Sequence, residues 1–592
     1  MITNNQVSVS GGRGNKMKWI LRVNTRTGKI VKQEATSEEM HWGGRLLISK
    51  FLLREVPPIC DPLGRHNKLI IAPGLLGDTV VTTTGKFSVG GKSPLTRGVK
   101  ESDVGGEAGK KIARLGIKAL VLEEIPDKPG TKILFVKAIE ATLSEFPELK
   151  GKQVSETIQI LRGRFGRQAG IICIGPAGEM KMAGAGVAVT DAQDIQVRYA
   201  ARGGLGAVMG SKGIKAIVVD DTGAVQPLVF DEGLLRDAGK TLTQAIMADP
   251  KTENRHNYGT PAVLMACNEL GILPTRNFSA GQFEKAEELS GEHIAEVIAG
   301  RGGEGRSGTP CVRGCVISCS NVFPDPSGKK TVASIQYENI ALLGPNCGIG
   351  SVDDIAELND LCNQVGVCAI ETGAAIGVAM EAGVIPFGDA EGAKDLIRQI
   401  GRGTYLGRIL GNGAVITGKV LGVRRVPAIK GQAIPAYDPR SLKGNGVTYT
   451  TSPMGADHTA GNALETAKTV DPLAIENQVE NSRRLQIRAA ILDTMGLCLF
   501  TRPPFVKRPD LFGLFLKGRY GWDFTYEDVQ KMGIDALETE RQFNQQAGVS
   551  EEFYDLPEFM REEPLPPRNS VFDIPLEEMK RIWTVKIPKD VF

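Results

Sequence analysis

The segment Cys311-Val-Arg-Gly-Cys315-Val-Ile-Ser-Cys319 carries three cysteines at intervals of four residues. On a helical or turn backbone, residues four apart lie on one side, so the three thiolates can converge on one object. A 4Fe–4S cluster takes four thiolates, and the fourth must then come from elsewhere in the chain. Structural zinc sites favour cysteine pairs two residues apart with histidine close by, and this segment has neither. We therefore expect an iron–sulfur cluster rather than zinc or a set of small buried thiols.

The composition excludes several classes of protein. A chain of 592 residues with mixed charges and a net charge of +3 has no basic stripe, so no nucleic-acid partner is expected. No apolar segment opens the chain and no run of about 18 apolar residues occurs, which predicts a soluble cytoplasmic protein with no membrane partner. In a reducing compartment, the ten cysteines are better suited to metal ligation than to disulfides.

Glycine is frequent, with 72 residues, and often occurs in pairs. It lets backbone approach a ligand closely, although a loop-rich fold also explains part of the excess. Two glycine-bearing loops, 85–106 and 198–212, combine bare backbone N–H groups with basic side chains, which suits phosphate. The second superficially resembles a dinucleotide fingerprint. The preceding segment 194–198 is too polar for the central strand that NAD(P) binding requires, so that reading is disfavoured.

The order of local patterns predicts an α+β fold. A hairpin at 18–32 is followed by short apolar β-type runs as far as 217–219, with few helices between them. From Pro227, helical spacing dominates, as in 233–247, and the C-terminal part after Pro509 mixes short helices with Pro-rich loops. We expect four units: a flexible tail (1–16), a β-rich base domain (17–222), a helical domain with the three cysteines (223–432) and a mainly helical third domain (433–592).

Two helix ends repeat the same pattern. Asn363-Gln-Val-Gly366-Val367-Cys368 and Asp493-Thr-Met-Gly496-Leu497-Cys498 each stop a predicted helix at glycine and place a cysteine two residues later. The first helix would begin at a cap on Ser351. An amide or carboxylate one turn before the stop can accept hydrogen bonds from a planar ligand. The repeat indicates a two-fold-like pocket for two similar molecules, unless it is a coincidence of common helix endings, and it makes Cys498 the candidate fourth cluster ligand.

Together these residues resemble the tungsten-dependent aldehyde:ferredoxin oxidoreductase family, from Trp19 to about Phe505. The specific motifs are Lys92-Ser-Pro-Leu-Thr96 with Ser102-Asp-Val-Gly-Gly106, the stretch 202–212, the cysteine triplet and Asp493-x-x-Gly-Leu-Cys498. The resemblance implies a β-rich base under two pyranopterin–dithiolene cofactors, covered by two largely helical domains. Tungsten or molybdenum would be held by four dithiolene sulfurs, without a protein ligand, and Mg²⁺ would bridge the pterin phosphates.

The resemblance also assigns residues. The cluster would be held by Cys311, Cys315, Cys319 and Cys498, with Lys86 beside it. The pterins and their phosphates would be contacted by Asp103, Gly105, Arg202, Gly203, Asn363, Val367, Asp493 and Leu497. This chain departs from the family in two places. Asn363 and Cys368 replace the two aspartates of the first helix-end motif, and the spacing after Cys311 is one residue longer than the family's.

Glu338 and His458 match the family's proposed acid–base pair. A glutamate among Ile335, Tyr337 and Ile340 would be partly desolvated and could hold a raised pKa. Histidine titrates near neutrality and can donate to a carbonyl oxygen. The alternatives are a surface carboxylate that starts a helix and a structural histidine, which is how we interpret the other four histidines.

The expected activity is oxidation of an aldehyde with water to a carboxylic acid, with electrons passing through the cluster to ferredoxin or a dedicated iron–sulfur subunit. A flavin-containing subunit that serves NAD and an oligomeric assembly belong to the same expectation. One alternative is a benzoyl-CoA reductase-type catalytic subunit. The other is a non-catalytic iron–sulfur electron-transfer subunit. Such a subunit would need neither some 590 residues nor two helix-end motifs for pterin binding.

Overall fold

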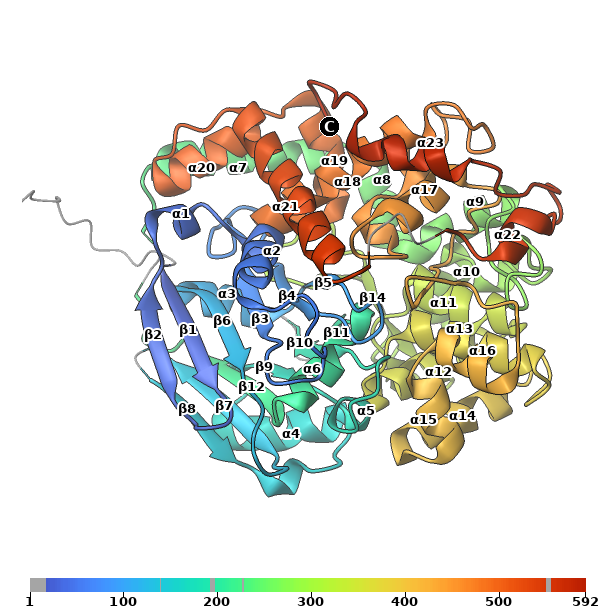
Figure 1. Ribbon diagram of the computed structural model, residues 1–592, viewed down its shortest axis with the longest axis horizontal. Helices are drawn as coiled ribbons and strands as arrows, with labels where there is room; N and C mark the ends of the chain where they lie inside the picture. The colour runs from blue at the N-terminus through green and yellow to red at the C-terminus, as the bar shows by residue number, and fades with distance from the viewer. Residues whose placement is uncertain (1–17, 139, 192–196, 226–227, 550–554) are drawn as a thin grey trace, which may run out of the picture.

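The computed structural model describes residues 18–138, 140–191, 197–225, 228–549 and 555–592. The predicted tail 1–16 and most of the polar segment 194–198 lie outside these residues. Strands gather in the N-terminal part of the chain, and helices of the rest cover them on two sides (Figure 1). The predicted α+β fold, β-rich first and mainly helical afterwards, is confirmed. The boundaries at 222 and 432 stay predictions.

The β-rich part consists of two six-stranded sheets with the same strand order. The first runs β2 (Ile30–Glu34), β1 (Trp19–Asn24), β6 (Ile117–Glu123), β3 (Leu69–Pro73), β4 (Phe87–Lys92), β5 (Val99–Val104). The second runs β8 (Ala141–Glu145), β7 (Lys132–Lys137), β12 (Ile214–Asp220), β9 (Gly170–Cys173), β10 (Val187–Thr190), β11 (Val197–Ala200). In each, one pair is parallel, β1–β6 and β7–β12, and every other pair is antiparallel.

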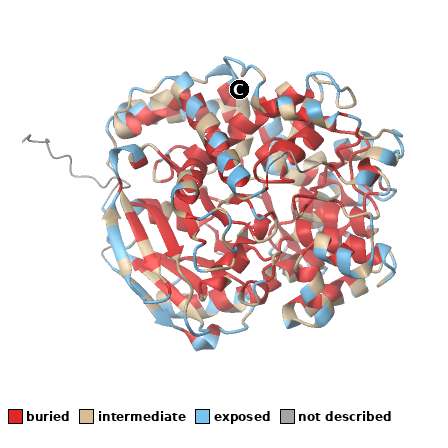
Figure 2. Cartoon of the chain, in the orientation of Figure 1, coloured by how far each residue is buried: buried red, intermediate tan, exposed pale blue. Residues whose placement is uncertain are grey.

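The helices within this part repeat as well. In each half a helix follows the first hairpin, and a shorter helix precedes the last strand: α2 (Gly44–Glu55) and α3 (Glu107–Arg114), then α4 (Val154–Phe165) and α6 (Leu205–Ser211). Apolar side chains from both sheets share one core, including Ile71 and Leu120 from the first and Ile172 and Ile217 from the second. The two halves are therefore one ββαβββαβ unit used twice. Figure 2 shows the buried interior and the exposed outer hairpins.

The remaining chain is mainly helical. Its main helices are α7 (Glu232–Met247), α8 (Pro250–Tyr258), α9 (Leu264–Glu269), α10 (Gly291–Arg301), α11 (Tyr337–Leu343), α12 (Val352–Val365), α13 (Ala369–Glu381), α14 (Ala390–Arg402), α17 (Lys443–Thr451), α18 (Gln478–Met495), α20 (Leu511–Tyr520) and α21 (Tyr526–Gln546). A small sheet of β13 (Arg306–Thr309), β14 (Ser320–Pro324) and β15 (Lys330–Val332) brackets the cysteine triplet. No helix among the described residues is long and apolar enough to cross a membrane.

Helix α12 has the N-terminal cap, the glycine stop and the apolar face that its sequence predicts. The hydroxyl of Ser351 accepts a hydrogen bond from the backbone N–H of Asp354 at 3.3 Å, and Gly366 ends the helix in the left-handed conformation with φ of 81°. Ile355, Leu358 and Val365 are buried along one face. Caps and an apolar stripe thus place Asn363 and Val367 at a fixed point beside the sheets.

Three sequence-based predictions about local structure were wrong. Neither glycine-bearing interval is mainly a loop: 85–106 is mostly the hairpin of β4 and β5, and 198–212 is mostly the end of β11 and helix α6. The β-rich part contains the 12-residue helix α2, whose apolar residues lie on most of its surface and so give no clear stripe. A Cβ on Gly90 of β4 would lie 2.4 Å from Ile48, so glycine in this strand lets α2 pack closely. The C-terminal part contains the 21-residue helix α21, not only short helices.

Candidate cofactor and active site

The two repeated helix ends occupy corresponding places on the two sheets. Gly74 follows β3 and Gly175 follows β9, and each lies against a helix end. A Cβ on Gly74 would lie 2.1 Å from the nitrogen of Gly496, and a Cβ on Gly175 would lie 2.8 Å from the nitrogen of Gly366. Because any side chain at these positions would clash, glycine is required for this close approach of backbone.

Each helix end also pairs with its sheet. Leu497 forms an isolated antiparallel bridge with Thr84, and Val367 forms one with Ala185. The backbone N–H of Leu497 donates to the backbone oxygen of Leu492, and that of Val367 makes the corresponding bond to Cys362, both at 3.0 Å. The sequence repeat is therefore also a structural one.

Around the second helix end, the site is rich in charge. Arg45 of α2 donates from Nε to Glu540 at 2.8 Å and from Nη1 to Asp493 at 3.3 Å. Lys86 forms an ion pair with Asp103. Burial, with the negative charge of Asp103, raises the pKa of the Asp493 carboxyl to about 7. Two sequence-predicted residues, Asp103 and Asp493, thus act on each other here.

The corresponding place beside the first helix end has different chemistry. The strand pairing aligns Tyr199 of β11 with Ala188, as it aligns Asp103 of β5 with Ser88. The Tyr199 hydroxyl donates to the backbone oxygen of Asn363. The half with Asn363 therefore presents a phenol and an amide where the other presents two carboxylates.

Arg202 lies buried at the N-terminus of α6 and faces the helical part of the chain. Its Nη2 donates to the backbone oxygen of Ala433 at 2.5 Å, while Nε and Nη1 are buried without a hydrogen-bond partner among the described residues. Gly203 has φ of 78°, and a Cβ there would lie 2.3 Å from Lys100. Lys100 in turn forms a buried ion pair with Asp457, and this positive charge, with that of Arg202, lowers the pKa of Asp457 despite its burial.

Glu338 and His458 face each other near Arg202. Glu338 lies in the first turn of α11, and its Oε2 accepts a hydrogen bond from the backbone N–H of Ala436 at 3.0 Å. Its Oε1 lies 3.4 Å from His458 Nδ1, but the two atoms lack hydrogen-bond geometry and each is buried without a partner among the described residues. The Tyr437 ring lies 5.6 Å from the His458 ring. A carboxylate oxygen and an imidazole nitrogen are thus both open to a third group.

The four predicted cluster cysteines come together from two distant segments. Burial and the charges of Cys311 and Cys498 raise the pKa of Cys315 to about 12, and burial with the same two charges also raises the pKa of Cys319. Gly105 lies against this group, since a Cβ there would be 3.2 Å from Cys311 Sγ. The charges of Asp103, Cys498 and Cys311 raise the pKa of Lys86 although burial lowers it.

The polar and thiol side chains gathered here fit the cofactors that the resemblance implies. Buried polar atoms without a hydrogen-bond partner among the described residues include Asp103 Oδ1, Arg202 Nε and Nη1, Glu338 Oε1 and His458 Nδ1, which are acceptors and donors that a polar cofactor could satisfy. Within the same residues, no three His, Cys, Asp or Glu side chains are grouped to hold a metal ion. In a 4Fe–4S cluster each thiolate binds its own iron, so the sulfurs need not converge on a single ion.

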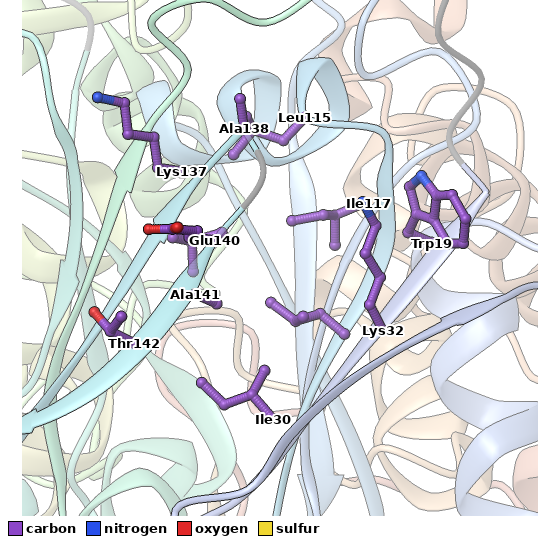
Figure 3. Close-up of a pocket in the computed structure, with 12 residues that line it drawn as sticks. Trp19, Ile30, Lys32, Leu115, Ile117, Lys137, Ala138, Glu140, Ala141 and Thr142 are labelled. Atoms are coloured by element: carbon purple, nitrogen blue, oxygen red, sulfur yellow. The ribbon is translucent and has the colours of Figure 1, made fainter.

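A separate cavity of about 480 Å³ lies elsewhere, between the outer hairpins of the two sheets (Figure 3). It is lined by apolar residues such as Ile30, Ile117 and Val136, with Lys32 and Lys137 among its polar residues. None of the predicted site residues lines it, so it is distinct from the candidate site.

Several residues of this site were not predicted from the sequence. These residues lie close in space to the predicted site residues, but most of the residues that they contact are distant in the sequence. They are Arg45, Lys100, Asp457 and Tyr437. The position of Asp457, directly before His458, is the one local signal that could have singled it out.

Comparisons with known proteins agree with this architecture. Residues 20–221 match the N-terminal domain of aldehyde ferredoxin oxidoreductase, and residues 237–583 match domains 2 and 3 of the same family. The tungsten-containing aldehyde ferredoxin oxidoreductase of Pyrococcus abyssi is 34% identical, covering 92% of each chain. That of Pyrococcus furiosus is 33% identical, covering 96% of this chain and 97% of its own.

More distant similarity extends to other activities. The WOR-like subunit of an aliphatic sulfonate oxidoreductase from Pyrococcus furiosus is 26% identical over 83% of this chain and 80% of its own. The active site complex BamBC of benzoyl-coenzyme A reductase superposes with a TM-score of 0.79 at 17% identity, covering 96% of this chain and 94% of that one, which is a likeness of fold alone. From the two domain matches and the relatives above 30% identity, the chain belongs to the aldehyde ferredoxin oxidoreductase family.

Proposed function

We propose that the protein is a tungsten or molybdenum bis-pyranopterin oxidoreductase that converts an aldehyde and water to a carboxylic acid. The balanced change is R–CHO + H₂O → R–COO⁻ + 3 H⁺ + 2 e⁻. The observation that carries the proposal is the pair Glu338 and His458, whose facing atoms are 3.4 Å apart, buried and open to a third group. The relatives' printed name, tungsten-containing aldehyde ferredoxin oxidoreductase, supports the same reaction.

The two cofactor halves would be held at the two repeated helix ends. Asp493 and Leu497 would contact one pterin, and Asn363 and Val367 the other. The pterin phosphates and the Mg²⁺ between them would be bound by residues of the β-rich part. These residues are Asp103, Gly105, Arg202 and Gly203. When bound, the metal would supply two-electron oxidation chemistry, and the dithiolene sulfurs would hold it.

The protein's own contribution is proton handling in a site shielded from water. Glu338 is fixed through Oε2 by the backbone of Ala436, which leaves Oε1 to accept a proton from the attacking water. His458 donates a hydrogen bond toward the aldehyde oxygen. Its neighbour Asp457 is anchored by Lys100, so the loop that carries the imidazole is held in place.

The electrons would leave through a 4Fe–4S cluster held by Cys311, Cys315, Cys319 and Cys498. Arg313 and Gly314 of the cysteine loop are exposed, and Cys315 is partly exposed, so one edge of the cluster would reach the surface. A one-electron carrier, ferredoxin or a ferredoxin-like subunit, would accept electrons there. A flavin-containing subunit that serves NAD and an oligomeric assembly remain part of this proposal.

Anaerobically purified protein, matured with tungstate or molybdate, tests the proposal. We expect tungsten or molybdenum near one per chain, about four irons, and pterin released on denaturation. Reduction of ferredoxin or a viologen dye with acetaldehyde or benzaldehyde should follow. Absence of both heavy metals from such a sample would overturn the proposal. Iron without pterin would indicate the electron-transfer subunit, and ring reduction of benzoyl-CoA without aldehyde oxidation would indicate the reductase.

A further inference from the structure

Helix α8 packs directly onto the segment that carries the cysteine triplet. A Cβ on Gly308, three residues before Cys311, would lie 2.6 Å from the Nε2 of His256 on this helix. Gly259, which ends the helix with φ of 68°, lies against the backbone oxygen of Cys319, 3.2 Å from where its Cβ would be. The last turn of α8 is thus held next to the cluster cysteines.

Arg255 projects from this last turn toward the other cluster segment. Its guanidinium carbon lies 4.4 Å from the centre of the Phe500 ring. The backbone N–H of Phe500 donates to the sulfur of Cys498 at 3.5 Å. Because Cys319 and Cys498 are the two cysteines whose charge acts on Arg255, the guanidinium lies beside both segments that would hold the cluster.

The charge of Arg255 is not neutralised by the protein. Among the described residues, no carboxylate forms an ion pair with it, and its buried Nη1 has no hydrogen-bond partner. The carboxylate of Asp249 acts on it only at a distance and caps the helix by accepting from Lys251. Lys86, another cation beside the cysteines, is paired with Asp103. A half-buried guanidinium whose buried Nη1 has no partner is unusual and calls for an acceptor.

We propose that Arg255 is a positioning residue for the iron–sulfur cluster, which stabilises the reduced cluster with an uncompensated positive charge and an N–H donor and thereby raises its reduction potential. The proposal rests on the cluster of the proposed function. A cluster bound by four thiolates carries negative charge, and reduction adds more. In a partly buried setting of low dielectric constant, a nearby cation favours the more negative state, and hydrogen bonds to the sulfurs act in the same direction.

The test is an EPR-monitored redox titration of the complete, metal-loaded enzyme with Arg255→Gln and Arg255→Lys variants. The glutamine variant should keep its iron and shift the cluster's midpoint potential to a more negative value. The lysine variant, which keeps the charge but not the planar donor, should shift it less. Lys251→Gln removes an exposed charge from the same helix and should leave the potential unchanged.

An unchanged potential in Arg255→Gln with full iron would overturn the proposal, as would an equal shift in Lys251→Gln. If Arg255→Gln loses its iron, the lysine variant decides, because a wild-type potential there would leave no role for the guanidinium donor. Iron analysis of the wild-type enzyme separates this inference from the proposed function. A wild-type protein without iron contradicts the cluster itself, whereas a loaded cluster with an unshifted potential contradicts only the role of Arg255.

Discussion

Gly74 and Gly496 are packed so closely that the Cβ of an alanine at position 74 would lie 2.1 Å from the backbone nitrogen of Gly496. Gly74 directly follows strand β3 of the first sheet and Gly496 ends α18, so this contact joins the β-rich part to the helical part. It also fixes the helix end that carries Asp493 and Cys498.

We expect Gly74→Ala to destabilise the protein by about 1–3 kcal/mol, the range for overpacking a tight site. The neighbour is backbone and cannot move aside cheaply. Denaturant-induced unfolding followed by circular dichroism measures the effect. Gly163→Ala is the matched control, because a Cβ there meets nothing within 4 Å and the residue lies in helix α4. Equal stability of the two variants would contradict the close packing.

Changing Glu338→Gln should reduce kcat for aldehyde oxidation by about 10²–10⁴-fold, the usual contribution of a general base. The amide keeps a hydrogen-bond acceptor for Ala436 but cannot take a proton. Tungsten and iron content should stay at wild-type values. Glu284→Gln, which alters an exposed ion pair with Arg276, serves as the control. Full activity in Glu338→Gln would exclude this residue as the base.

Replacing Cys498→Ser should lower the iron content and abolish or alter the cluster's EPR signal, although this cysteine is 179 or more positions after the triplet. Thiolate ligation is lost while the size of the side chain is nearly kept. Cys60→Ser changes a partly buried thiol outside the group and should retain four irons. Iron analysis and EPR of the reduced protein distinguish the two. A Cys498→Ser protein with a native cluster would require another fourth ligand.

Removing one member of the buried Lys100–Asp457 pair should be strongly destabilising. Asp457→Asn would leave the Lys100 ammonium buried without its counter-charge, at a cost of about 3–5 kcal/mol. The double variant Lys100→Met with Asp457→Asn should recover much of that loss, since it removes both charges. Unfolding free energies of the two single variants and the double variant form the required cycle. Simple additivity would show that the pair does not interact.

Lys118, which is not among the candidate site residues, gives a test of pH dependence. Its Nζ donates to the backbone oxygen of Met40 at 3.0 Å, and burial lowers its pKa to about 7. In the unfolded chain lysine titrates near 10.4. Between about pH 7 and pH 10 the unfolded state therefore binds more protons, so the unfolding free energy should rise with pH, by at most about 1.4 kcal/mol per unit.

The variant Lys118→Met should weaken this rise and be more stable than wild type at pH 7, where folding would otherwise bury a charge. Lys212, with a pKa lowered by burial to about 8, should keep part of the rise. Chemical denaturation at pH 7, 8.5 and 10 measures the effect, with the exposed Lys128→Met as control. Parallel curves for Lys118→Met and wild type would contradict the assignment.

Local signals in the sequence predicted some parts of this protein well. Ser351 and Gly366 bound α12 because capping is decided by neighbouring residues. The similarity of the two helix ends is visible in the letters because the same close approach requires glycine in both. These are features whose cause lies within a few residues.

Other features depend on contacts that a single sequence does not reveal. Arg45 binds Glu540, 495 residues away, and Lys100 binds Asp457, 357 residues away. The repeated unit in the β-rich part escaped notice because strand order is set by pairing and burial, which many sequences satisfy. Helix α2 was not predicted because it is buried on most sides, so its apolar residues do not show the 3.6-residue spacing of a one-sided helix.

The repeated unit has a consequence for the electron path of the proposed function. Both halves offer the same framework to a helix end, yet only the end at Cys498 meets the cysteine triplet, while its counterpart Cys368 lies near Arg202. In the proposed function, a reacting centre between the two helix ends would therefore pass its electrons on at the Cys498 side alone.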